Sequence, residues 1–592
     1  MNEKEWTIMI YMAGDNNLAV DMAYAMEQIK GVAEQGADSP NLFVYYDGNS
    51  PAIPTLYCDF SEPGKPRYVR SYKVPNKLDP PISKKENENA ANPRSILNFV
   101  DWCVNKVEVE NNGEITFGRR AQKYALIFSG HSLGFQDIGL FKDETSGRSM
   151  KMTDFYDMLQ GLISNKKDLQ ALAEANNWLD DDQKVENELL GQKLDLLGFD
   201  SCVMGMLEVG YQFNLVAKTM IASEGSVPSA GWTYAKILGS LGREQCRNLD
   251  TRSVAEMFVK EFIHSQDSYT VGGVSVDMAA WDLGRFDNLA DAFDDLAEAL
   301  IQCFKDPKSR IYRQMERAIL HVHWKCQSYM YDQNVDLGDF CELLDRECGL
   351  IADELGGDED TEALKRVQKE CRGVLKQLQK AVILGGYSGG GYQYSNGVSV
   401  FFPWSRDAYE VSRKNYETLF FAKDVKRERL SWSDFLKKYL YQVSLRKFEA
   451  PVQDVPAGAR YRYYSGVAFD ELPRAAAAGN GTASTKIAGQ EGTRIAGQEG
   501  TRIAGQEGTR IAGQEGTRIA GQEGTRIAGQ EGTRIAGQEG TRLAGGGAGT
   551  FFQSMRLFKN VESRWDVSGF TKKPDETDRP LSSNAKAGST NT

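Results

Sequence analysis

Two apolar stretches decide the fold: Tyr124-Ala-Leu-Ile-Phe-Ser-Gly-His131 and Leu194-Asp-Leu-Leu-Gly-Phe-Asp-Ser-Cys202. Each has the length and apolar character of a buried strand, and one ends on an imidazole while the other ends on a thiol. The carboxyl ends of parallel strands meet at one edge of an open sheet, where ligands and chemistry collect. If the two runs are neighbours, His131 and Cys202 emerge side by side and give a thiol with a base beside it.

The first 300 residues alternate strand-like and helix-like segments around these two stretches. Further strands are predicted at 6–13, 42–46, 219–223 and 273–279, and helices at 18–34, 95–107 and 204–213. A long Pro-rich excursion fills residues 50–95. Alternation of this kind predicts an α/β fold, with a mostly parallel sheet between two layers of helices.

A second, mostly helical portion follows. Helical spacing of apolar residues runs over 282–305 and 361–382, and an aromatic run covers 392–404. The glycine-rich segment 385–391 lacks the Lys-Ser/Thr of a phosphate-binding loop and predicts a flexible connection. The predicted organisation is therefore an α/β domain at 1–300, a helical and strand extension at 301–445, and a tail at 446–592.

The tail contains seven copies of Ile-Ala-Gly-Gln-Glu-Gly-Thr-Arg between Ile487 and Arg542. Each copy has one branched apolar residue and two glycines, so it buries too little surface to offset the entropy of the chain. We expect a disordered repeat tail. The periodicity leaves a β-solenoid open as the alternative.

Charge and cysteine content limit the function classes. The formal charge of −12 argues against a nucleic-acid binder or a protein of anionic membranes. No apolar stretch approaches the roughly 18 residues that span a bilayer, and the first residues do not resemble a signal peptide. The nine cysteines form no C-x-x-C pair, which predicts reduced thiols, no metal site and a cytoplasmic location.

Cys202 stands out among these cysteines. Most thiols of this kind are simply small buried side chains. This one ends an apolar strand, shares the predicted edge with His131, and precedes a predicted helix whose amino end lowers the pKa of a nearby thiol. His131 alone is more often structural, but its position in the turn Ser129-Gly-His-Ser-Leu-Gly134 exposes the ring.

Three motifs in order resemble the clostripain family of cysteine peptidases, which belongs with the caspases, legumain and gingipains. They are Trp6-Thr-Ile-Met-Ile-Tyr-Met-Ala-Gly-Asp-Asn-Asn-Leu18, Phe128-Ser-Gly-His131 and Gly198-Phe-Asp-Ser-Cys-Val-Met-Gly-Met-Leu-Glu-Val209. The resemblance implies a caspase-like three-layer sandwich and a Cys/His dyad. In it Cys202 attacks to form a thioester and His131 protonates the leaving amine. The implied oxyanion hole is formed by the backbone N–H groups of Ser132, where relatives generally carry Gly, and Cys202.

The resemblance also implies cleavage after Arg or Lys. A cationic side chain entering a pocket needs a carboxylate partner, and Asp200 matches the acid that the family uses there. The alternative is that Asp200 only accepts hydrogen bonds at the end of its strand. Relatives often carry a second acid near the loop Ser226 to Gly231, which has none here, so Glu224 is the substitute.

Relatives are matured by cleavage after a basic residue between the histidine and the cysteine, which makes Lys166 and Lys167 the candidate autocleavage sites. Some relatives need calcium, and the run Asp180-Asp-Asp182 is a candidate for holding it. A solvated acidic surface is the alternative. No other cofactor is expected.

The sequence thus predicts a cysteine endopeptidase that carries out limited proteolysis of a specific intracellular partner protein. A bacterial defence or stress response is a suitable setting, and a regulatory protein is a further expected partner. The competing interpretation is a catalytically inactive caspase-like module that binds or scaffolds. No nucleic acid or membrane partner is expected.

Overall fold

The structure is a computed structural model. It describes residues 4–33, 40–49, 55–62, 64–70, 87–105, 107–109, 115–117, 119–136, 140–179, 184–241, 249–266, 275–329, 333–355, 359–423 and 430–443, with short strands in the repeats and at 556–559. None of the helices in these ranges is both long and apolar enough to cross a membrane.

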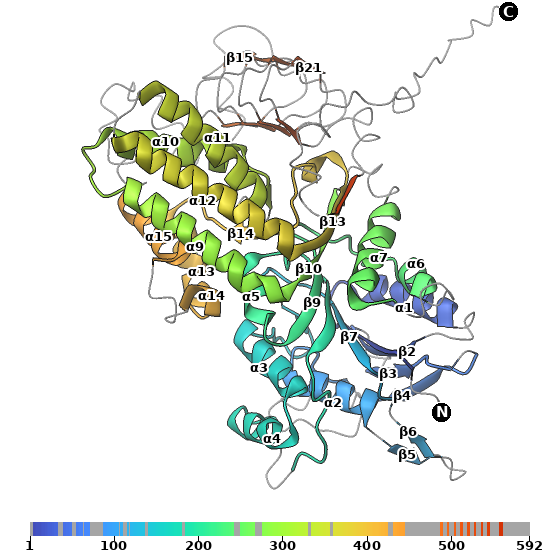
Figure 1. The fold of residues 1–592 in the computed structure, drawn as a ribbon. Helices are drawn as coiled ribbons and strands as arrows, with labels where there is room; N and C mark the ends of the chain where they lie inside the picture. Colours follow the sequence, from blue (N-terminus) through green and yellow to red (C-terminus); the bar gives the residue numbers. More distant parts are fainter. Residues whose placement is uncertain are drawn as a thin grey trace, which may run out of the picture.

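A ten-stranded sheet forms the centre of the molecule (Figure 1). Its strands in spatial order are β23 (Arg556–Lys559), β13 (Val382–Ser388), β10 (Val276–Asp282), β9 (Ala217–Ala222), β8 (Leu194–Asp200), β7 (Lys123–Ser129), β1 (Trp6–Gly14), β2 (Asn41–Gly48), β3 (Leu56–Asp59) and β4 (Arg67–Arg70). The five strands from β9 to β2 run parallel to one another. Each strand outside them pairs antiparallel with its neighbour. The predicted strands at 6–13, 42–46, 219–223 and 273–279 correspond to β1, β2, β9 and β10.

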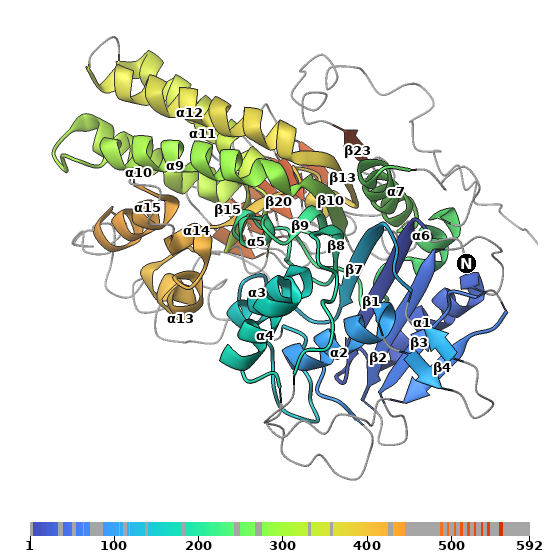
Figure 2. The same ribbon diagram turned by 60° about the horizontal axis from the view of Figure 1, so that its bottom comes forward.

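Helices cover both faces of this sheet, as Figures 1 and 2 show. Successive side chains of a strand point to opposite faces, so Ile8 and Ile10 of β1 enter one core while Met9 and Tyr11 enter the other. The first core contains side chains of α1 (Ala19–Ala33), α6 (Tyr234–Leu241) and α7 (Thr251–His264). The second contains side chains of α2 (Pro93–Val104), α3 (Met152–Ile163), α5 (Leu207–Phe213) and α9 (Phe286–Cys303). The predicted three-layer α/β fold is confirmed.

The extension packs against the second face of the sheet. Its helices are α10 (Arg310–Lys325), α11 (Leu337–Leu355), α12 (Glu359–Ala381), α13 (Arg406–Tyr416), α14 (Phe420–Lys423) and α15 (Trp432–Lys438). A small antiparallel sheet joins β11 (Ser328–Tyr329), β12 (Asn334–Asp336) and β14 (Ser399–Phe401). The boundaries at 300 and 445 stay predictions. Smaller elements are α4 (Lys166–Ala175) and the pair β5 (Val107–Val109) and β6 (Ile115–Phe117).

One expectation about the sheet is wrong, and one segment adds strands that the sequence analysis did not predict. The predicted flexible connection at 385–391 begins within β13, which pairs antiparallel with β10 and packs against α7. Burial of Ile383 and Leu384 in the core offsets the cost of ordering its glycines. The Pro-rich excursion contains β3 and β4, which extend the sheet beyond β2.

The repeats also differ from expectation where the structure describes them. Short strands occupy Lys486–Ala488, Arg494–Ala496, Arg502–Ala504, Arg510–Ala512, Arg518–Ala520, Arg526–Ala528, Arg534–Ala536 and Arg542–Ala544. Every second one pairs in parallel register, giving two four-stranded sheets. Pairing between repeats satisfies backbone groups that a single repeat leaves open. These strands follow the β-solenoid alternative, and the rest of the tail prediction lies outside the described residues.

Candidate active site

The ends of β7 and β8 bring the two reactive side chains to one edge. The strands are parallel neighbours, as predicted, and their last paired residues are Ser129 and Asp200. His131 and Cys202 each follow two residues later, so the same register carries both past the edge. Beyond the strands, the hydroxyl of Ser132 donates a hydrogen bond to the carbonyl oxygen of Cys202. The loop after the histidine is therefore bonded directly to the loop after the cysteine.

The imidazole of His131 is held by a residue that sequence reasoning did not select. Its Nε2 lies 2.6 Å from Oδ1 of Asn17, which belongs to the turn after β1. Because an amide oxygen only accepts hydrogen bonds, this contact places the proton of a neutral ring on Nε2 and leaves Nδ1 as the acceptor. Burial, followed by the charge of Lys142, lowers the pKa of His131 and favours the neutral ring.

The thiol of Cys202 is half-buried against Val227. The Val227 N–H donates to Sγ at 3.4 Å, and Sγ lies 3.8 Å from the Val227 carbonyl oxygen. Burial raises the pKa of this thiol, although the hydrogen bond from Val227 opposes the effect. The expected lowering by a helix amino end is wrong, because α5 begins only at Leu207 and lies five residues away.

The raised pKa of Cys202 and the lowered pKa of His131 thus both favour the neutral form of the group. Each group has its own partner, Val227 for the sulfur and Asn17 for the ring. A thiolate–imidazolium pair is not favoured by these surroundings, so use of Cys202 as a nucleophile would require its thiol to lose a proton. The acceptor nitrogen Nδ1 of His131 is the group suited to receive it.

Backbone strain is concentrated beside both reactive residues. Val203, immediately after the cysteine, has φ 61°, and Phe141 has φ 48°. The left-handed region is unfavourable for a β-branched residue, so the surrounding contacts must hold Val203 there. They include the hydrogen bond of 2.9 Å from its N–H to Gly225, while the Phe141 N–H donates to the carbonyl of His131 at 3.0 Å.

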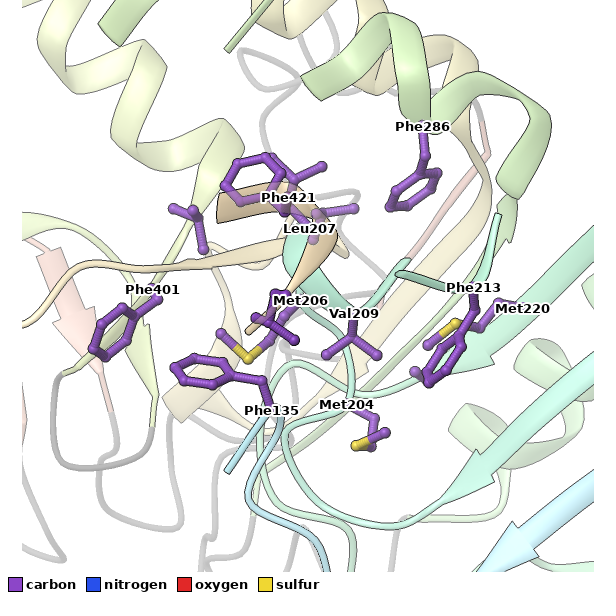
Figure 3. Close-up of a cluster of buried hydrophobic side chains, with 14 of the residues drawn as sticks. Phe135, Met204, Met206, Leu207, Val209, Phe213, Met220, Phe286, Phe401 and Phe421 are labelled. Carbon is purple, nitrogen blue, oxygen red and sulfur yellow. The ribbon is translucent and has the colours of Figure 1, made fainter. Parts of the chain in front are cut away.

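An apolar cluster packs against the loop after the cysteine and the loop after the histidine (Figure 3). Met206, from the loop after the cysteine, and Phe135, from the loop after the histidine, lie in it with Phe401 of β14. The rings of Phe135 and Phe401 pack edge to face at 5.1 Å. Gly134 has φ 62°, and a Cβ there would lie 2.6 Å from the sulfur of Met206. Only glycine allows the two loops to approach this closely.

Asp200 lies beneath the cysteine with both carboxylate oxygens occupied. It accepts hydrogen bonds from the Ser129 hydroxyl at 3.0 Å, the Trp232 N–H at 2.9 Å and the Tyr234 hydroxyl at 2.8 Å. Burial raises its pKa to about 6 although these donors oppose the shift. The carboxylate therefore holds the loop from 226 to 232, and its role toward substrate stays a prediction.

Glu224 belongs to a buried acidic group that we call the Cys-side cluster, made of Glu224, Asp277 and Asp336. Asp277 accepts the N–H groups of Glu224 at 2.7 Å and Gly225 at 2.9 Å. Glu224 itself accepts the N–H of Gly397 at 2.8 Å. Burial raises the pKa of Asp277 to about 7, and burial with the neighbouring Asp336 raises that of Glu224 well above its usual value. Full burial favours a supporting role for Glu224, whose predicted substrate contact stays untested.

The remaining candidates lie away from this edge. Lys166 and Lys167 are exposed in the first turn of α4, whose Asn165 side chain caps the helix by accepting the Asp168 N–H. The predicted cleavage at either lysine would require this helical turn to unwind. Asp180, Asp181 and Asp182 lie outside the described residues.

Sequence reasoning missed Asn17 and Asp277. Asn17 had a usable signal, because it ends the Asp15-Asn-Asn17 turn directly after a buried strand of the same parallel sheet. Asp277 lies inside β10, where the sequence alone gives no reason to connect it with a loop fifty residues earlier.

Comparison with known proteins adds family evidence. A sequence model described as the clostripain family matches residues 10–439. Clostripain of Hathewaya histolytica is 26% identical over 332 residues, which cover 49% of this chain and 55% of clostripain. The chain thus spans about half the length of this curated relative.

Two solved structures are also similar. An inactive zymogen C11 protease from Parabacteroides distasonis shares 19% identity with a TM-score of 0.41, covering 72% of this chain and 99% of that one. A secreted C11 cysteine protease from Bacteroides thetaiotaomicron, iotapain, shares 15% identity with a TM-score of 0.45, covering 71% and 99%.

Proposed function

Because the chain belongs to the clostripain family, we propose that it is a cysteine endopeptidase with Cys202 as nucleophile and His131 as general acid and base. The observation that carries the proposal is the register of β7 and β8. It pairs Ser129 with Asp200 and so delivers an imidazole and a thiol to one sheet edge. Asn17 acts as the positioning residue that fixes the ring and its protonated nitrogen.

The reaction follows from these groups. Nδ1 of His131 takes the thiol proton as the sulfur of Cys202 attacks the scissile carbonyl carbon. The backbone N–H groups of Ser132 and Cys202 stabilise the oxyanion that forms. The imidazolium then gives its proton to the leaving amine, and the C–N bond breaks to leave a thioester on Cys202. Water, deprotonated by the same ring, attacks the thioester and releases the acid product and the thiol.

We assign recognition of Arg or Lys before the scissile bond to Asp200, two residues before the nucleophile. Its carboxylate is buried, where attraction to a guanidinium or ammonium is stronger than in water. The loop over it contacts the carboxylate through a glycine near its end: a Cβ on Gly231 would lie 2.6 Å from Asp200 Oδ2. Glu224 supports this loop from behind. Lys166 or Lys167 would be the point of maturation cleavage.

The setting we propose is limited proteolysis of a specific partner protein in the cytoplasm, within a bacterial defence or stress response. Cys58, Cys103, Cys341, Cys348 and Cys371 are buried, unbridged thiols, as a reducing compartment favours. Iotapain is described as secreted, so fractionation of the producing cell is the relevant measurement. Recovery of the full-length chain from the culture medium would contradict this location.

Hydrolysis of a fluorogenic peptide with Arg before the reporter tests the activity. We expect Cys202→Ala and His131→Ala to lower kcat/KM by about 10³-fold or more. His264→Ala, which replaces an exposed histidine of α7, is the matched control and should leave the rate unchanged. Equal rates in the parent and Cys202→Ala would instead favour the inactive scaffold.

A second comparison tests the specificity residue. Citrulline has the shape of Arg without its charge, so the ratio of kcat/KM for Arg and citrulline peptides measures recognition of charge. We expect Asp200→Asn to reduce this ratio about 10–100-fold, since the loss of an ionic hydrogen bond costs about 1.5–3 kcal/mol. An unchanged ratio with a lower overall rate would assign Asp200 a purely structural role.

A further inference from the structure

Three buried aspartates converge beneath the histidine loop, and we call them the His-side cluster. Asp15 follows β1, Asp47 ends β2, and Asp143 lies in the hairpin after β7. Each is fully buried. One carboxylate oxygen from each lies within 4.8 Å of those from the other two. The β1–β2 register, which pairs Ala13 with Asp47, brings the first two acids to the same sheet edge.

Two carboxylate oxygens of this cluster accept no hydrogen bond from the described residues. Asp47 accepts the Thr55 hydroxyl at 2.8 Å through Oδ1, and Asp15 accepts the Thr145 N–H at 3.3 Å through Oδ2. Asp15 Oδ1 and Asp47 Oδ2 are buried with no hydrogen-bond partner among the described residues. Buried polar atoms almost always have a partner, and an unpaired buried carboxylate is strongly unfavourable. A cation bound between the three carboxylates would supply a partner for both of these oxygens.

The third acid, Asp143, is held in place by backbone N–H groups. Asp143 accepts the Ser146 N–H at 2.7 Å and the Ala90 N–H at 2.9 Å. These bonds point its carboxylate inward and still leave lone pairs, because each carboxylate oxygen accepts more than one contact. Three hard oxygen donors in a buried space match the preference of Ca²⁺ and Mg²⁺.

We propose that the His-side cluster binds one hard divalent cation, with Asp15, Asp47 and Asp143 as ligands. Three buried carboxylates favour Ca²⁺, which binds about six to eight oxygen ligands in flexible geometry, over Mg²⁺, which usually keeps several waters and binds through one or two carboxylates. This site is separate from the Asp180–Asp182 run that the sequence indicated for calcium. Its charge offsets three carboxylates that would otherwise repel one another.

The site connects to the reactive edge through short links. Asp15 is two residues before Asn17, whose oxygen bonds the ring of His131. The intervening Asn16 donates to the carbonyl oxygens of Ala13 at 3.0 Å and Lys142 at 2.8 Å. The hairpin that carries Asp143 also donates the Phe141 N–H to the His131 carbonyl. A cation here would therefore fix both backbone segments that hold the imidazole.

Direct binding to the full chain tests the proposal. The protein carries Cys202→Ala, is freed of metal with EDTA and is titrated with CaCl₂ by calorimetry. We expect one saturable site and a rise in Tm of about 3–5 °C at a hundredfold excess over Kd. MgCl₂ should give a smaller rise. Since this background lacks the nucleophile, failure here leaves the proposed peptidase activity untouched, and the reverse also holds.

Variants locate the site. Asp15→Asn, Asp47→Asn and Asp143→Asn should each weaken Ca²⁺ binding at least tenfold, while replacing Asp180, Asp181 and Asp182 together with Asn should leave it unchanged. Hydrogen exchange of the parent provides a location without mutation: Ca²⁺ should protect residues 13–17 and 141–146. The proposal is overturned by the absence of saturable binding, by protection confined to other segments, or by binding that persists in all three variants.

Discussion

Two acidic clusters support the two reactive loops, and they differ in how many of their carboxylate oxygens are occupied by backbone N–H groups. On the cysteine side, backbone N–H groups occupy most of the carboxylate oxygens: Asp277 takes two, Glu224 takes one, and Asp336 takes those of Asp339 and Asn396. Among the described residues, one oxygen of this cluster, Glu224 Oε1, has no partner. On the histidine side, two oxygens have no partner among the described residues. Similar residue types thus serve different ends, since saturated acids organise a loop while unsaturated ones are suited to a cation.

The largest effect is expected from breaking the saturated side. Asp277→Ala removes the acceptor for two buried N–H groups, and each orphaned donor costs about 1–3 kcal/mol. We expect a loss of about 3–4 kcal/mol in the free energy of unfolding, measured by urea in the Cys202→Ala background. Asp353→Asn, at an exposed position of α11, is the control. A loss below about 0.5 kcal/mol would show that the Cys-side cluster does not hold the loop.

A pH experiment sharpens the comparison through a further buried acid on the cysteine side, Glu208 of α5. This side chain is fully buried and accepts the Phe401 N–H at 2.9 Å, and burial raises its pKa to about 7. Its folded-state pKa exceeds the unfolded value of about 4.3, so the parent loses stability as pH rises between those values. Glu208→Gln does not ionise and keeps the acceptor oxygen.

Relative to the parent, Glu208→Gln should therefore gain about 3 kcal/mol of unfolding free energy between pH 4.5 and pH 8. Urea unfolding at the two pH values measures this gain. Both pH values are needed, because burying the amide of the variant changes the free energy of unfolding by an amount that does not depend on pH. If the difference between variant and parent is the same at both pH values, burial does not raise the pKa of this carboxyl in the folded state.

The histidine side is probed through Asn17. Asn17→Ala removes the acceptor for Nε2 of His131, and the loss of such an orienting partner is expected to reduce kcat about 10–100-fold with little change in KM. Asn17→Asp keeps an acceptor and adds a charge that favours the imidazolium, so it should restore part of kcat and move the histidine limb of the pH–rate profile upward. An alanine variant with the parent's profile and rate would remove Asn17 from its positioning role.

The smallest effect is expected where the two sides meet. Ser132→Gly removes the hydroxyl that bonds the Cys202 carbonyl but keeps the backbone N–H proposed for the oxyanion hole. We expect kcat/KM to fall about threefold to tenfold, in line with one neutral hydrogen bond. A loss of 10³-fold in the peptide assay would mean that the hydroxyl, and not the backbone, carries the function.

The sequence predicted the parts of this site that depend on strand ends. The apolar runs before His131 and Cys202 set the register of β7 and β8, and the three-layer fold follows from alternation of strands and helices. The sequence did not predict the contacts between segments that are distant along the chain. Neither the bond from Asn17 to His131 nor the hold of Asp277 on the loop at 224–225 is encoded in a local pattern.

The errors have a common physical origin. Glycines in β13 and prolines around β3 read locally as connections, but pairing with β10 and β2 offsets their low strand propensity. The same reasoning applies to the thiol of Cys202, where the distance to α5 and the burial by Val227 decide the pKa rather than the order of elements along the chain. The roles predicted for Ser132, Asp200 and Glu224 came from the resemblance to the clostripain family and not from local patterns, and they stay predictions.

One short segment of the extension has a consequence for biosynthesis. Residues 397–401 donate three backbone N–H groups to the cysteine side: Gly397 to Glu224, Ser399 to the Gly205 carbonyl, and Phe401 to Glu208. A nascent chain emerging from the ribosome displays the thiol and the imidazole almost two hundred residues before this segment is synthesised. Until then the loop lacks these three donors. Under the proposed mechanism, the growing polypeptide would therefore be protected from premature attack by Cys202, and the order of synthesis would set the time at which the site forms.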